Sequence, residues 1–158
     1  MAIVSSLVFA SLASMAILTQ QQQQPPSTIA AYAQQQSQAF TAKLSGKDEV
    51  PPVNTQATGT TQFQLSSDGK EISYDLTTTN LNGFTMAHVH QGKAGENGPP
   101  VAALQMGKGK ITSSDLQGPL AGKQISDLVD LMKNGGAYAN VHTQQNPNGE
   151  IRGQIMTG

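Results

Sequence analysis

The sequence predicts a mostly β protein, an antiparallel β-sandwich or barrel with one short helix. Three observations lead to this fold class. Apolar and polar residues alternate with a period of two in several short segments after residue 38. Turn-forming residues, mainly Gly, Pro, Asn and Asp, separate these segments. Only the segment 125–133 carries apolar residues at helical spacing. Short strands divided by turns are typical of antiparallel sandwiches and barrels.

The N-terminus predicts export from the cytoplasm. Residues 3–18 are apolar or small and uncharged, and this run is shorter than an ordinary membrane span. Ala31-Tyr32-Ala33 before Gln34 would suit a signal peptidase, although it lies well beyond the run and no Lys or Arg precedes the run. We expect residues 1–18 to be a signal peptide or, alternatively, an uncleaved anchor that tethers the protein to a membrane. Both interpretations place the remainder outside the cytoplasm, either secreted or anchored to the outer face of the membrane.

We expect residues 19–37 to be a linker and residues 38–158 to be the folded domain. The linker contains the tracts Gln20–Gln24 and Gln34–Gln36 and the pair Pro25-Pro26. Such a segment buries too little apolar surface to offset the entropy lost on ordering, so we expect it to be disordered.

The expected strands follow one another along the domain. They are residues 40–44, 63–65, 72–76, 84–90, 101–106, 137–143 and 150–156. Ser67-Asp68-Gly69 predicts a hairpin turn between the second and third strands. Residues 145–149, with Pro147 and Gly149, predict another between the last two.

One amphipathic helix interrupts the strands. Ile125, Leu128, Val129 and Met132 recur at helical spacing, and Gly135-Gly136 provides a stop. We expect this helix to cross one end of the sandwich and cover its core.

Composition excludes several classes of function. The chain has 9 Lys and Arg against 10 Asp and Glu, and no basic stripe suggests a nucleic-acid partner. It contains no cysteine, so disulfides and thiolate ligands are excluded and any metal must be held by other donors. No Ser-His-Asp order or paired-carboxylate spacing predicts a catalytic residue. The identity of any protein or small-molecule ligand stays open.

The three histidines are the strongest indication of function. His88 and His90 are two residues apart, so on a strand both point to the same face, away from Val89. His142 lies on the later predicted strand and could join them if the two strands are neighbours. Three imidazole nitrogens suit copper or zinc and leave a fourth coordination position open. The sequence therefore predicts a mononuclear site of His88, His90 and His142.

A structural interpretation of the same histidines stays open. Strand histidines often make ordinary hydrogen bonds, and these three could tie loops together through Glu49, Glu150 or Arg152. The motifs would then serve to satisfy buried polar groups.

Three motifs, taken in order, resemble the chordin-type (CHRD) domain over about residues 38–158. They are residues 44–52 (LSGKDEVPP), residues 87–92 (AHVHQG) with 94–99 (AGENGP), and residues 138–143 (YANVHT) with 147–153 (PNGEIRG). The resemblance implies an extracellular domain, single in many microbial proteins, and a fold type but no reaction.

A weaker similarity is to copper/zinc superoxide dismutase, another antiparallel Greek-key sandwich in which a His-Val-His strand supplies two copper ligands. By that similarity His88 and His90 match the two ligands, and His142 could match a later one. The fold expectation is thus a Greek-key sandwich or barrel, superoxide-dismutase-like or immunoglobulin-like. The present chain has no fourth histidine and no cysteine, so the dinuclear dismutase site cannot be rebuilt and its activity does not carry over.

Two classes of function follow. The first is an exported, non-catalytic binding or interaction protein. The second is a mononuclear copper or zinc protein for metal storage, delivery or redox chemistry.

Overall fold

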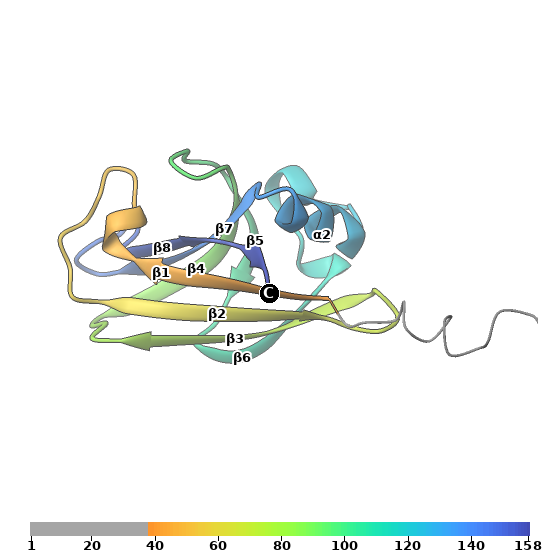
Figure 1. Ribbon diagram of the computed structural model, residues 1–158, viewed down its shortest axis with the longest axis horizontal. Helices are drawn as coiled ribbons and strands as arrows, with labels where there is room; N and C mark the ends of the chain where they lie inside the picture. Colours follow the sequence, from red (N-terminus) through yellow and green to blue (C-terminus); the bar gives the residue numbers. More distant parts are fainter. Residues whose placement is uncertain (1–37) are drawn as a thin grey trace, which may run out of the picture. The chain divides into compact units, whose positions relative to one another are not determined.

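The computed structural model describes residues 38–158, and the predicted export segment and linker lie outside them. The described part is built of antiparallel strands with one α-helix (Figure 1). The strands are β1 (Ala39–Ser45), β2 (Thr58–Leu65), β3 (Glu71–Thr79), β4 (Phe84–Gln91), β5 (Pro100–Leu104), β6 (Gly107–Thr112), β7 (Ala137–Thr143), β8 (Ile151–Gln154) and β9 (Met156–Thr157). The helices are α2 (Ile125–Lys133) and the 3-10 turns η1 (Gly46–Asp48), η2 (Ser113–Asp115) and η3 (Gly118–Leu120).

The strands form a nearly closed antiparallel barrel. Their order is β5-β4-β7-β8-β1-β2-β3-β6, and β9 pairs with β1 outside this path. The two end strands, β5 and β6, are joined only by Gln105 and Met106, and the Gln105 N–H donates a hydrogen bond to Tyr74 Oη on β3 at 2.9 Å. If β5 and β6 are taken as neighbours through this link, β4, β5 and β6 lie side by side in sequence order. Strand β3, which precedes them in the chain, then lies beside β6 at the far side of the three. This arrangement is a Greek key.

Alternation along the strands separates a buried core from an outer face. On β4 and β7 the core side chains are Ala87, Val89, Ala139 and Val141, all at most 1% exposed. The residues between them point away from the core. The histidine strands therefore present their histidines on the outside of the barrel.

Helix α2 covers one end of the barrel, as the sequence predicts. Four of its apolar residues, Ile125, Leu128, Val129 and Met132, are buried in the core cluster, and Figure 1 shows α2 at the end of the domain, beside β7. A capping interaction fixes its start, since the Gln124 N–H donates to Asp127 Oδ2 at 2.9 Å.

The predicted mostly β, antiparallel fold with one helix is confirmed, and three details of the strand prediction are wrong. The sequence pattern does not predict β6, because Gly-Lys-Gly-Lys-Ile-Thr has small residues where the period-two rule expects apolar ones. Gly109 is required there because a Cβ would collide with the Tyr74 ring. Strand β5 ends at Leu104 rather than at residue 106. The predicted strand 150–156 is divided into β8 and β9, with Ile155 buried between them.

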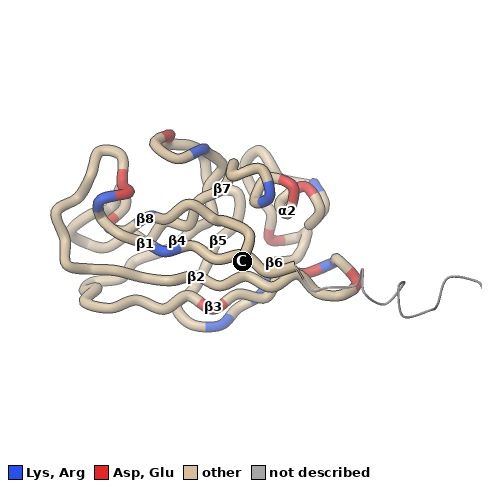
Figure 2. Tube along the Cα trace, in the orientation of Figure 1, with Lys and Arg blue, Asp and Glu red and all other residues tan. Residues whose placement is uncertain are grey.

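Charges of both signs are interspersed over the loops and around α2 (Figure 2). Among residues 38–158, no helix combines the length and apolar character needed to cross a membrane.

Candidate metal centre

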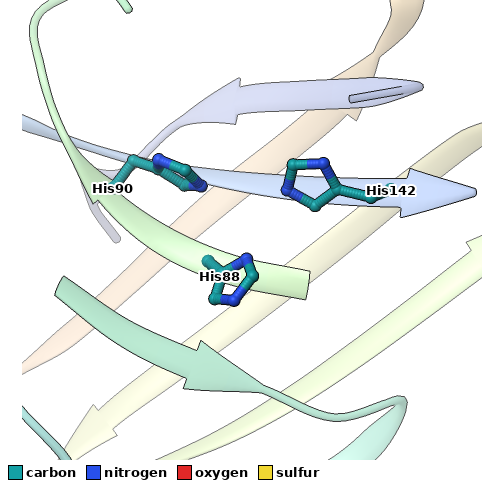
Figure 3. A group of neighbouring side chains, drawn as sticks. All are labelled: His88, His90 and His142. Carbon is teal, nitrogen blue, oxygen red and sulfur yellow. The ribbon is translucent and has the colours of Figure 1, made fainter. Parts of the chain in front are cut away.

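Strands β4 and β7 lie side by side and bring the three histidines together. The antiparallel register pairs Met86 with His142, His88 with Asn140 and His90 with Tyr138. His142 is thus diagonal to His88 on the shared outer face, as Figure 3 shows. The predicted convergence of His88, His90 and His142 is present, and their candidate ligand atoms all lie within 4.8 Å of one another.

Two of the rings are oriented by backbone carbonyls. Nδ1 of His90 donates to the carbonyl oxygen of Gly98 at 2.8 Å, and Nδ1 of His142 donates to that of Pro147 at 3.0 Å. A carbonyl oxygen can only accept, so each Nδ1 carries the proton and each Nε2 keeps its lone pair. In metal sites the ligating histidine is held in the same way by a hydrogen bond from its second nitrogen.

One nitrogen of each histidine ring is buried and has no hydrogen-bond partner within residues 38–158. These atoms are Nδ1 of His88, Nε2 of His90 and Nε2 of His142. Figure 3 shows a nitrogen of each ring turned toward the space between the three rings. Leaving a buried polar atom unsatisfied costs about 1–3 kcal/mol. Three such atoms facing one space would be satisfied together by one ion.

Burial keeps the three rings neutral. It lowers the pKa of His90 to about 4, against a weaker opposing effect of the Gly98 carbonyl. Burial also lowers the pKa of His88, helped by the charge of His142, and it lowers the pKa of His142 against the effect of the Pro147 carbonyl. At neutral pH the rings are therefore unprotonated, which is the form that binds a metal.

Binding of one ion requires the three rings to approach one another. Three nitrogens that bind one ion at about 2.1 Å in a tetrahedral site are ~3.4 Å apart. From the present limit of 4.8 Å the nitrogens must come closer by about 1 Å. His88 is partly exposed, so its ring has room to turn.

Loops cover the outer face above the histidines. His142 is only 7% exposed and Asn140 only 3%, although both point away from the core. Three segments cover this face, namely residues 46–57, 92–99 and 144–150. Each makes a hydrogen bond to it. In the first, Glu49 Oε1 accepts from Asn140 Nδ2 at 2.6 Å, and in the other two the carbonyls of Gly98 and Pro147 accept from His90 and His142. The loops therefore shield part of the site from bulk water, and the site is not part of the hydrophobic core.

Arg152 holds the loop that carries Gly98. It is 2% exposed, and its guanidinium donates to Asn97 Oδ1 at 3.0 Å, to the Lys93 carbonyl at 3.1 Å and to the Glu96 carbonyl. It also lies 3.5 Å from the centre of the Tyr138 ring, which in turn stacks on the His90 ring with 5.0 Å between centroids. Arg152 thus supports His90 in two ways, through the loop whose Gly98 carbonyl accepts from His90 and through the Tyr138 ring that stacks on it.

A cavity of about 310 Å³ adjoins His90. Glu49, Tyr138 and Asn140 are among its lining residues. Burial raises the pKa of Glu49 to about 7, against the hydrogen bond from Asn140 and the charge of Arg152. The cavity therefore contains a carboxyl group that changes charge near neutral pH.

The expected polar network through carboxylates and Arg152 is not found among residues 38–158. Glu49 binds Asn140, Glu150 accepts from Thr55, Thr143 and Asn146, and Arg152 binds the 93–97 loop. None of these hydrogen bonds reaches a histidine. The motif carboxylates organise the loops. His90 and His142 instead bond to the backbone carbonyls of Gly98 and Pro147, which ties these two histidines to the loops as the structural interpretation expects of ordinary hydrogen bonds.

A family model of the CHRD domain matches residues 40–155. The chain belongs to the CHRD domain family. The match covers almost all of the described residues, including the three histidines and the Glu49, Asn140 and Arg152 positions. No curated protein and no solved structure matches the chain.

Sequence reasoning does not find the carbonyls of Gly98 and Pro147, because every residue has a carbonyl and only the loop path selects one. It also misses the stack of His90, Tyr138 and Arg152. A signal for Tyr138 is present in the sequence: it shares the strand parity of Asn140 and His142, so it has to lie on the histidine face.

Proposed function

We propose that this CHRD protein is an exported, non-catalytic binding protein whose ligand is one copper or zinc ion held by His88, His90 and His142. The observation that supports this most directly is the set of three buried ring nitrogens, facing one space, that have no hydrogen-bond partner within residues 38–158.

The chemistry of the donors favours these two metals. Neutral imidazole is a good ligand for copper and zinc, whereas calcium and magnesium prefer oxygen. In the described part of the chain, the three-residue group contains no carboxylate. Three protein ligands leave a fourth position for water or another molecule.

Storage or delivery of the metal fits this site better than dismutase chemistry. The chain supplies three histidines and no cysteine, so it offers no second metal site of the dismutase type.

Export is supported by the apolar residues 3–18, and N-terminal sequencing of protein recovered outside the cytoplasm tests it. A start at Gln34 supports a cleaved signal, and an intact N-terminus in the membrane fraction supports the anchor.

Elemental analysis of the full chain tests the metal site. The protein is stripped with a chelator, reloaded separately with copper and with zinc, and freed of excess metal. Wild type is expected to retain close to one equivalent of at least one metal, and His142→Ala is expected to lose most of it.

Met156→Leu is the control, because Met156 is exposed on β9, which pairs with β1 away from the histidine strands. It should retain the metal. A stripped wild type that takes up neither copper nor zinc would sink the proposal.

A further inference from the structure

The face of β4 and β7 that carries the histidines presents six side chains. In cross-strand pairs they are Met86 with His142, His88 with Asn140 and His90 with Tyr138. Three of the six are the histidines. The other three are the candidates for completing the coordination of an ion.

Two of these candidates are already engaged. Nδ2 of Asn140 donates to Glu49 Oε1 at 2.6 Å and to the Ile151 carbonyl at 3.4 Å. Tyr138 accepts from the Gly98 N–H at 3.1 Å, and its ring lies between His90 and Arg152. Neither side chain can turn to a metal without breaking these contacts.

Met86 is the remaining side chain. It lies directly opposite His142 and two residues before His88, so its Cβ is about 4.5–5.5 Å from that of His142. A β-bulge between Phe84 and Met86 shifts the register at this point, and from Met86 onward the strand keeps the parity that puts residues 86, 88 and 90 on one face. The unbranched thioether can adapt its position, having three rotatable bonds.

Met86 is one of the exposed large apolar side chains among residues 38–158, together with Phe84, Met106 and Met156. It is 50% exposed, on a strand whose neighbouring His88 and His90 are half-buried and whose Ala87 and Val89 are buried. Packing in the core therefore does not explain a methionine here. The strand register places it at the end of the histidine face, opposite His142.

We propose that Met86 is a fourth, soft ligand that makes the site selective for Cu(I). This inference rests on the proposed function and names its ion. A thioether sulfur binds Cu(I) well and adds little to the binding of zinc or Cu(II), which imidazoles already hold. The three neutral imidazoles and one neutral thioether place no negative charge on the ion, which suits the single charge of Cu(I).

The test compares wild type, Met86→Leu and Met156→Leu. Leucine keeps the apolar volume and removes the sulfur. Met156, on β9, is 58% exposed and is the matched control because it pairs with β1, away from the histidine face. Affinities of the full chain for Cu(I) are measured against a chromogenic chelator under anaerobic reducing conditions, and those for Cu(II) and zinc by separate competition.

Met86→Leu is expected to weaken Cu(I) binding about tenfold or more, equivalent to ~1.4 kcal/mol, and to change Cu(II) and zinc binding less than about threefold. Met156→Leu should leave all three affinities unchanged. X-ray absorption of the Cu(I)-loaded protein should show a sulfur neighbour in wild type that is missing in Met86→Leu.

The outcomes separate the two proposals. If wild type binds a metal and Met86→Leu binds Cu(I) as tightly as wild type, only the role of Met86 is overturned. An equal loss for all three ions would also overturn it, because it would indicate a structural role. If wild type binds none of the ions, the metal site itself is wrong.

Discussion

Nδ1 of His90 donates a hydrogen bond to the carbonyl oxygen of Gly98, 2.8 Å away, on the loop that follows the same strand. This bond fixes the tautomer of His90 and directs Nε2 toward the other two histidines. Gly98 fits there because it has no side chain: a Cβ would collide with the Gln91 carbonyl oxygen. The geometry of the candidate metal centre therefore depends on a glycine that is not itself a candidate ligand.

Gly98→Ala is expected to displace this carbonyl and to weaken metal binding about 10-fold to 100-fold, the usual effect of losing a hydrogen bond that orients a ligand. Metal competition measures the change. Gly95→Asn is the control in the same loop, since nothing lies within 4 Å of a Cβ at residue 95 and Asn tolerates its positive φ of 82°. Equal metal affinity in Gly98→Ala and Gly95→Asn would contradict the role of Gly98.

Strand parity predicts which side chains lie together at the site, whereas the paths of the loops determine which groups bond to these side chains. The spacing of His88 and His90 is enough to place them on one face of a strand, and the neighbouring β7 adds His142. The sequence does not show that Asn140 meets Glu49, because the two are 91 residues apart and belong to a strand and a distant loop. Similarly, β6 has no apolar alternation, and its place in the sheet follows from closing the barrel beside β3.

Arg152→Lys is expected to destabilise the domain by about 2 kcal/mol or more, because hydrogen bonds to charged groups are worth ~1.5–3 kcal/mol each. Lysine cannot reproduce the fork that holds the Lys93 and Glu96 carbonyls and Asn97. Urea unfolding measures the loss. Lys110→Met is the comparison: it removes an exposed ion pair with Glu71 and should cost at most about 1 kcal/mol. If the two variants are equally stable, Arg152 does not hold the loop.

Glu49→Gln is expected to change how stability varies with pH. The folded-state pKa of Glu49, about 7, is above its ordinary value of 4.5, so its contribution is fully present below pH ~4.5 and is lost as the pH rises through about 7. Gln keeps an oxygen to accept from Asn140 and cannot ionise. Unfolding free energies at pH 5 and pH 8 should therefore show that Glu49→Gln loses less stability than wild type over this interval. The same loss in both proteins would show that Glu49 does not ionise there.

Removing the metal is expected to leave a domain that weakens in acid. Burial lowers the pKa of all three histidines in the fold, whereas in the unfolded chain they titrate near ~6.5. The unfolded state therefore binds more protons below that pH. The histidine contribution is complete above pH ~6.5 and is lost as the pH falls toward about 4, the pKa of His90.

This decline opposes the effect of Glu49 and is best measured in the Glu49→Gln background. Thermal unfolding of the metal-free protein should show stability falling between pH 6.5 and pH 4.5, and replacing the three histidines by glutamine should reduce the slope. Adding the bound metal at 100 times its dissociation constant should stabilise the fold by ~2.7 kcal/mol at neutral pH, because it binds only the folded state. That gain should shrink as the pH falls, since protons compete for the same three nitrogens. A metal-induced stabilisation that is as large at pH 4.5 as at pH 7.5 would show that other ligands hold the ion.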